Sequence, residues 1–299
     1  MTLCICWRED EHTVHFASDS RLNLGGNAID IGAKVLRVDA RIEPAVPARD
    51  GSDQGASKEP EPTYSLQLGF AVAGGALAAL TLVDALGHLL RRLQYGPMDP
   101  SMDSVAMTVM KFFNAVRSEF VRVLFDNGEF MFALGGRCPV NQRTRVFKFD
   151  IRLEGDGLAV DHEEVLRNQN DVIAFGSGRK AYEKRSKTGA SHLDALKDVM
   201  EAPACPTVGG FVQYGRFGPH GHGFQLMAVH DYRICEAEKV IKSGVVFRGL
   251  PLYGTAPQGF EGGLAIPQRV LDPFRERLKD FDERGFAFEE FGRCGGDGA

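Results

Sequence analysis

The sequence has little net charge and no segment typical of a membrane span or a secretory signal. Its 35 Lys and Arg residues nearly balance 40 Asp and Glu residues, for a formal net charge of -5. This balance offers no electrostatic footprint for nucleic acid or an anionic membrane, so we expect neither partner. The start of the chain turns acidic at Glu9 and Asp10, and the longest apolar run, 66–82, is rich in Ala and Gly. We therefore expect a cytoplasmic protein without a transmembrane helix.

Cysteine is also sparse, with six residues scattered through 299. This argues against a disulfide framework. Cys4 and Cys6 lie two apart in a strand pattern, but the sequence supplies no further metal ligands at a recognisable spacing, so we interpret them as buried strand residues. His220 and His222 are interpreted as parts of a hairpin loop, and the Gly-rich stretches lack the context of a phosphate loop. The sequence therefore predicts no metal and no cofactor.

Apolar patterns predict groups of strands that alternate with paired helices. The expected strands are 3–7, 13–18, 33–38, 64–73, 130–135, 144–150, 158–163, 171–175, 209–217 and 223–230. Helical spacing follows Gly74-Gly75 as far as Leu93, and it follows an N-cap at Ser101 as far as Val123. One or two helices precede Met200, and a further candidate covers 268–283. Grouped strands between paired helices predict an α+β fold, a four-layer αββα sandwich of two stacked, mostly antiparallel sheets flanked by helices.

The length of the chain fits one large domain with appendages. We place that domain at 2–235 and a C-terminal extension at 236–299. Within the domain, 43–63 contains four prolines among charged and small residues, a composition typical of disorder. We therefore interpret 43–63 as a disordered surface insertion.

The beginning of the chain carries a candidate catalytic group. If 10–11 is the two-residue turn of the first hairpin, Thr2 lies directly opposite Asp19. Removal of Met1 would give Thr2 a free α-amine, with an ordinary pKa of about 7.7–8.0, beside its own hydroxyl. Lys34, brought alongside by the third strand, would repel the ammonium form of that amine, and Asp19 would offset the lysine charge. Each residue alone has an ordinary structural explanation, so the hypothesis rests on their joint arrangement.

A second feature is the pair Gly74-Gly75 at the expected strand-to-helix turn. Backbone N–H groups at the start of a helix stabilise developing negative charge, as an oxyanion site requires. The alternative is a tight turn that simply needs glycine.

Taken in order, these motifs resemble proteasome β-subunits and their bacterial ring-forming relatives of the HslV and Anbu types. The resemblance covers roughly 2–230 and rests on Thr2, Ser18-Asp19-Ser20-Arg21, Lys34, Ala73-Gly74-Gly75-Ala76 and Phe175-Gly176-Ser177-Gly178. It implies an N-terminal-nucleophile (Ntn) hydrolase in which Gly74 holds the oxyanion and Ser177 lies near the threonine amine. It also implies a ring-shaped homo-oligomer, and leaves open an ATP-dependent unfoldase partner. Segment 205–208, Cys-Pro-Thr-Val, departs from the family, which often has an acidic residue and a serine there.

The expected activity is that of a threonine-type endopeptidase or amidohydrolase that works through an acyl-enzyme. The catalytic residues would be Thr2, Asp19, Lys34, Gly74 and Ser177, and the substrate a peptide or unfolded protein. Two alternatives stay open: a small-molecule amidase with the same nucleophile, and a non-catalytic ring or scaffold subunit that retains Met1.

Overall fold

The computed structural model describes residues 2–24, 27–45, 62–74, 76–95, 99–115, 130–154, 157–219, 223–248, 250–252 and 270–290. Met1, Gly75, His220, His222 and most of the predicted disordered insertion, 46–61, lie outside the described residues. The first two residues of that insertion, Glu43 and Pro44, end a strand.

The first sheet begins with the N-terminal hairpin and carries the C-terminal part of the chain. Its path runs β11 (Val172–Phe175), β1 (Cys4–Arg8), β2 (Val14–Ser18), β12 (Gln213–Phe217), β13 (Gln225–Cys235), β14 (Val240–Phe247) and β15 (Leu250–Leu252). These neighbours pair antiparallel, while β16 (Val270–Leu271) and β17 (Ala287–Glu290) pair parallel with β13 and β14. The segment after 235 thus extends this sheet; its separation as a distinct extension remains a prediction.

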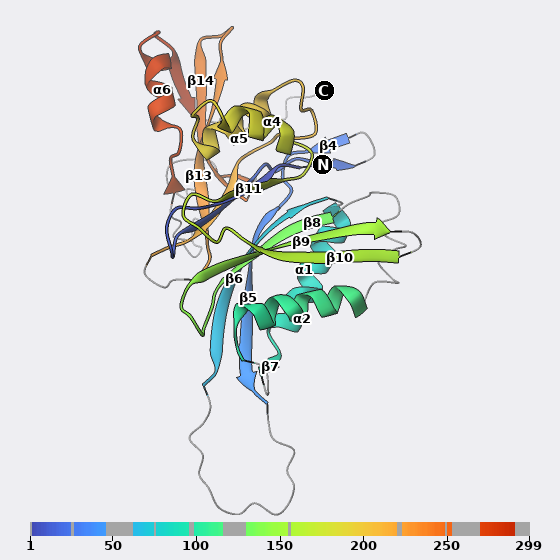
Figure 1. Ribbon diagram of the computed structural model, residues 1–299. Coiled ribbons are helices and arrows are strands. Elements are labelled where there is room, and N and C mark those ends of the chain that lie inside the picture. The colour runs from blue at the N-terminus through green and yellow to red at the C-terminus, as the bar shows by residue number, and fades with distance from the viewer. Residues whose placement is uncertain are drawn as a thin grey trace, which may run out of the picture.

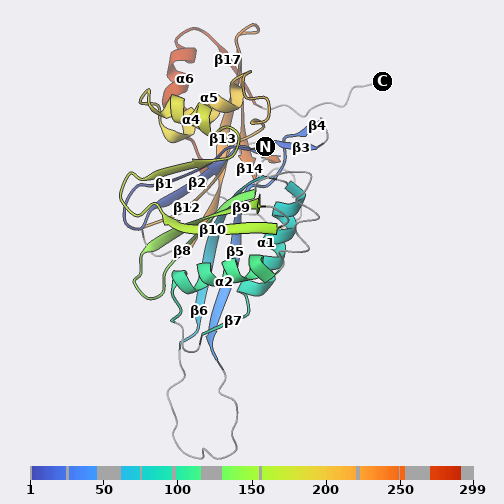
Figure 2. The ribbon, with the colours of Figure 1, turned by 45° about the vertical axis from the view of Figure 1, so that its right-hand side comes forward.

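The second sheet is built from the middle of the chain (Figure 1). Its order is β10 (Gly157–Val165), β9 (Thr144–Glu154), β8 (Phe130–Arg137), β6 (Tyr64–Ala73), β5 (Val35–Pro44) and β7 (Leu93–Tyr95). All neighbours are antiparallel except β5 and β7. A separate hairpin of β3 (Leu22–Leu24) and β4 (Asn27–Ile29) projects near the N-terminus (Figure 2).

Helices pack on both sheets. Helices α1 (Ala76–Leu90) and α2 (Met102–Ala115) cover the second sheet, where an aromatic group around Phe113 and Phe132 fills the contact. The first sheet is covered by α4 (Arg179–Ser186), α5 (His192–Glu201) and α6 (Arg275–Asp282). No helix among the described residues is both long enough and apolar enough to cross a membrane.

A third apolar cluster draws side chains from both sheets, so the two sheets face each other. Phe16 and Phe224 pack edge to face in it. Phe224 also lies where a Cβ on Gly69 of the second sheet would be, 2.5 Å from its ring. The close approach of the sheets therefore depends on the missing side chain at Gly69.

The predicted mixed α+β class with several sheets is confirmed, and most expected strands are present with ends shifted by a few residues. Two helix boundaries were wrong. Helix α1 ends at Leu90, and Leu93 belongs to β7; Val270 and Leu271 form β16, so the last helix starts only at Arg275. The predicted second helix is present as α2, and its expected continuation to Val123 lies outside the described residues.

The predicted register of the first hairpin was also wrong. Cys4 pairs with Ser18 and Arg8 with Val14, which places Asp19 opposite Leu3 rather than Thr2. The physical reason is a longer loop, 9–13, instead of a two-residue turn. The Asp10 carboxylate accepts hydrogen bonds from the N–H groups of His12 and Thr13, both at 2.7 Å. An Asx-type turn of this kind stabilises the loop without the glycine that a tight hairpin turn favours.

Candidate functional site

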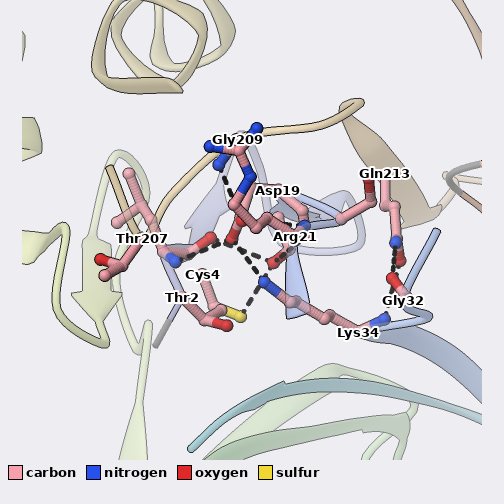
Figure 3. Close-up of polar contacts among 12 residues, drawn as sticks. Thr2, Cys4, Asp19, Arg21, Gly32, Lys34, Thr207, Gly209 and Gln213 are labelled. Carbon is pink, nitrogen blue, oxygen red and sulfur yellow. Dashed lines mark hydrogen bonds and ion pairs between the residues drawn. The ribbon is translucent and has the colours of Figure 1, made fainter. Parts of the chain in front are cut away.

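The candidate site is built where three strand ends meet. Thr2 lies just before β1, Asp19 just after β2 and Lys34 just before β5. The N–H of Leu3 donates to Asp19 Oδ1 at 3.0 Å, and Lys34 Nζ donates to the same oxygen at 2.9 Å. Since both nitrogens lie about 3 Å from one oxygen, they are at most about 6 Å apart. The lysine is therefore close to the peptide bond that joins Thr2 to Leu3. Figure 3 shows Lys34, Asp19 and Thr2 in this region.

The second oxygen of Asp19 orders the surrounding backbone. Asp19 Oδ2 accepts from the N–H groups of Arg21 and Gly209, both at 3.1 Å. With the contacts to Leu3 and Lys34, the carboxylate has four donors and no solvent exposure. A buried carboxylate with this many partners is fixed in orientation, as a residue that positions a neighbour needs to be.

Lys34 is itself buried and anchored through its backbone. Its N–H and that of Val35 donate to Gln213 Oε1, at 2.8 and 3.0 Å, and the Gln213 amide donates to the Gly32 carbonyl. Burial lowers the pKa of Lys34 below its ordinary value, against the opposing attraction of Asp19. The side chain therefore loses its charge at a lower pH than a surface lysine does.

Cys4 is the other potential nucleophile in this region. It is fully buried, and its thiol lies 3.2 Å from both Ser18 Oγ and the Val72 carbonyl oxygen. Burial raises the pKa of Cys4 to about 12, and the nearby Lys34 charge only partly opposes this. Because the thiolate is the nucleophilic form, Cys4 is inert at neutral pH. Cys4 is therefore a weaker candidate nucleophile than the Thr2 hydroxyl, which would have its own α-amine as a base.

The turn after β11 closes over the Thr2 carbonyl. Gly178 N–H and the Ser177 hydroxyl donate to that oxygen at 3.4 and 3.5 Å. Gly176 has φ of +95°, and a Cβ there would be 2.1 Å from the Thr2 oxygen and 3.4 Å from Ala73 Cβ. Only glycine fits, so Gly176 permits the close approach. Ser177 is exposed, and its contact to Thr2 in this structure is with the carbonyl.

Gly74 lies at the end of a strand of the second sheet, on the side of the turn after β11. It follows Ala73 at the end of β6, has φ of +131°, and leads into α1. Ala73 lies against Gly176, which itself lies against Thr2, so the end of β6, just before Gly74, is close to the candidate nucleophile. The first turn of α1 contains no acidic residue, which suits developing negative charge. The oxyanion role of Gly74 remains a prediction.

Thr207 was missed as a candidate. Its hydroxyl lies 3.2 Å from Ser177 Oγ. Arg21 and Asn23 hold this segment by donating to the carbonyls of Pro206 and Thr207, each at 3.1 Å. Segment 205–208, whose sequence differs from the family pattern, therefore supplies a hydroxyl next to Ser177. The only signal in the sequence was its position before Gly209.

No family model matches the chain, and no curated protein matches it. Similar solved structures include an Anbu Gly-1 mutant from Hyphomicrobium sp. strain MC1, at 16% identity over 76% of this chain and 86% of that one, with a TM-score of 0.46. Anbu from Yersinia bercovieri, described as an ancestral β-subunit, has 16% identity, covers 72% and 81%, and has a TM-score of 0.47. The Anbu complex of Pseudomonas aeruginosa, described as a helical assembly, has 14% identity, covers 73% and 82%, and has a TM-score of 0.46.

These comparisons correct the family resemblance drawn from the motifs. The three proteins are Anbu proteins, a family distinct from proteasome β-subunits and HslV, and the likeness is weak. With no matching family model, the chain is not assigned to the proteasome β-subunit group. Short motifs in the right order were insufficient because each also occurs for structural reasons. The geometry of the chain's own residues is therefore the basis for its function.

Proposed function

We propose that the protein is a threonine-type amidohydrolase, with the Thr2 hydroxyl as nucleophile after removal of Met1. The observation that carries this proposal is the buried Asp19–Lys34 ion pair, joined at 2.9 Å and bonded through Asp19 to the residue after Thr2. Burying a charged pair costs free energy, and a buried pair is weak evidence of stability alone. Its position beside the chain's first hydroxyl and potential first amine suits control of that amine.

The reaction follows from one residue that carries both a nucleophile and a base. The neutral α-amine of Thr2 takes the proton of its hydroxyl while the oxygen attacks a substrate carbonyl. The N–H of Gly74 donates to the oxyanion of the tetrahedral intermediate. The ammonium then gives its proton to the leaving amine, which leaves an ester on the Thr2 oxygen. Water, deprotonated by the same amine, hydrolyses that ester and frees the acid.

Lys34 and Asp19 act on the amine, and the hydroxyl pair acts on the backbone of Thr2. The positive charge of Lys34 disfavours the ammonium form, so more of the amine is available as a base near neutral pH. Asp19 holds Lys34 in place. Ser177 donates to the Thr2 carbonyl, Thr207 contacts Ser177, and both present hydroxyl groups to water on the open side of the site. These roles are positioning roles, because the reacting atoms belong to Thr2.

The proposal includes the finer architecture and the setting of the protein. Three apolar clusters, one between the sheets and one on the helix-covered side of each, support a four-layer αββα sandwich of the Ntn type. Ile29, at the end of β4, and Ile31, just after it, are 42% and 53% exposed. Exposed apolar residues on this projecting hairpin motivate self-association, in a ring as one closed form. We place the protein in the cytoplasm and its substrates among peptides.

The test is hydrolysis of fluorogenic peptides by the wild type and by Thr2→Ala. The control is Thr188→Ala, which removes the same hydroxyl at an exposed turn after α4. We expect Thr2→Ala to lose activity to background and Thr188→Ala to retain it. Retained activity in Thr2→Ala would remove the proposed nucleophile. Cleavage of small amides but not peptides would favour the small-molecule amidase, and Met1 retained on the purified protein would favour the non-catalytic scaffold.

A further inference from the structure

A cavity of about 930 Å³ opens on the second sheet and shares no lining residue with the candidate site. Its walls come from β5, from the start of β6, from the end of β8 and the loop after it, and from single residues just after α1 and just before β13. Sites for small organic molecules commonly have volumes of about 300–1,000 Å³. The cavity is therefore large enough for an organic ligand.

The charges around this cavity are unbalanced. Four arginines line it, with Asp39 as the one acidic lining residue: Arg37, Arg41, Arg91 and Arg137. This concentration occurs in a protein whose formal net charge is -5. Like charges that share one cavity repel each other, and an anion bound among them removes that repulsion.

Two of the arginines have carboxylate partners on their own strand. Arg37 Nε is 3.1 Å from Asp39, and Arg41 Nε is 2.6 Å from Glu43. These side chains are 41–61% exposed, so each pair contributes little and can rearrange around a ligand.

The other two arginines, Arg91 and Arg137, differ from Arg37 and Arg41 in their partners. Within the ranges that the structure describes, no carboxylate lies within ion-pair distance of Arg91 or Arg137, and the recorded side-chain partner of Arg137 is neutral Gln142 at 3.2 Å. Guanidinium groups bind phosphate and carboxylate oxygens through two parallel N–H donors. Both arginines are thus available to an anionic ligand.

The other lining residues indicate which further groups a ligand could contact. Gln67 and Ser65 offer polar groups, while Tyr64 and Pro139 provide apolar surface. We propose that the cavity binds a small organic anion with at least two negative charges, carried by phosphate or carboxylate groups. This site is independent of the proposed hydrolase activity and of Thr2.

The experiment is isothermal titration calorimetry at low salt with inorganic triphosphate and, separately, with citrate. The test variant is Arg91→Gln/Arg137→Gln. The control is Arg152→Gln/Arg167→Gln, which removes two exposed arginines that do not line the cavity and changes the net charge equally. Thermal unfolding of each variant confirms that it is folded.

We expect the wild type to bind these anions with Kd below about 1 mM. In the test variant the affinity should fall about tenfold per lost arginine, because charge-assisted hydrogen bonds are removed. In the control variant the affinity should be nearly unchanged. Preference for triphosphate or for citrate identifies the charged group of the natural ligand. Absence of binding of both anions at 10 mM, taken as about ten times that Kd limit, would overturn the proposal. Equal weakening in both double variants would also overturn it, because the effect would then be one of net charge.

Discussion

Replacing Lys34 with methionine tests the electrostatic core of the proposed mechanism. Methionine removes the charge and keeps an unbranched side chain of similar length. In the wild type, Lys34 Nζ lies at most about 6 Å from the nitrogen of the Thr2–Leu3 peptide. The amine nitrogen of Thr2 lies one residue, about 3 Å, from that peptide nitrogen, so a separation of about 6–9 Å applies to the two charges. At an effective dielectric constant of about 20, one unit charge then changes the energy of the other by about 2–3 kcal/mol, or about one to two pKa units.

The direction of the pKa shift of the Thr2 amine follows from the charges that remain near it. Without Lys34, the ammonium form of Thr2 loses a repulsive neighbour and keeps the attractive Asp19 carboxylate, so the amine pKa rises. The acid limb of kcat/KM against pH should then move to higher pH by up to about two units, and activity at pH 7 should fall about 10- to 100-fold. In Asp19→Asn/Lys34→Met the two opposite charges leave together, so the shift should be smaller than in Lys34→Met.

The assay is peptide hydrolysis from pH 5 to 10, with circular dichroism and thermal unfolding to confirm folding. The folding control matters because an unpaired buried Asp19 costs about 3–5 kcal/mol of stability, a loss that the double variant relieves. An unchanged acid limb in a folded Lys34→Met protein would refute the reasoning, since the charge would then have no influence on the base.

Three further predictions concern the turn over Thr2, the hydroxyl pair and the pH dependence of stability. Gly176→Ala should lower the free energy of unfolding by more than about 2 kcal/mol, because its Cβ would clash with the Thr2 carbonyl. The control Gly189→Ala has φ of +84° and no atom within 4 Å of the added Cβ, so it should cost only about 1 kcal/mol. Equal losses of the two variants in urea unfolding would show that the clash does not matter. Thr207→Val should slow hydrolysis of the acyl-enzyme about tenfold, which is measured as a larger burst relative to the steady state. Thr207→Ser should restore the rate. Identical bursts in the wild type and Thr207→Val would exclude a role for that hydroxyl. Burial lowers the folded-state pKa of Lys34, so the unfolded chain binds more protons just below the ordinary lysine pKa, and stability rises with pH there. The melting temperature of the wild type should therefore increase relative to Lys34→Met as the pH is raised toward about 10.4, and a constant difference would contradict this assignment.

The local features of the site were predictable, but its exact register was not. Alternation and turn residues indicated β1, β2 and the turn at Gly74. The proximity of Asp19 and Lys34 was expected on the condition that the third strand brings Lys34 alongside the first hairpin. The shift that places Asp19 opposite Leu3 arises from hydrogen bonds of the Asp10 carboxylate inside the loop. Such bonds depend on the loop conformation and leave no periodic pattern in the sequence.

Contacts between distant segments were the other unpredictable part. Thr207 lies beside Ser177 in a segment that Arg21 and Asn23 hold by hydrogen bonds, and these two residues are about 185 positions away in the chain. The parallel pairing of β17 with β14 likewise depends on tertiary packing after 235. Pattern and propensity describe single elements, whereas the neighbours of an element are set by packing.

Intact-mass spectrometry after incubation with a β-lactone probe tests the central claim most directly, because it reports removal of Met1 and the nucleophilicity of Thr2 together. We predict a protein that has lost Met1 and gained one probe mass, with the label on Thr2 and absent from Thr2→Ala. A protein that keeps Met1, or one that is labelled equally in Thr2→Ala, would contradict the account.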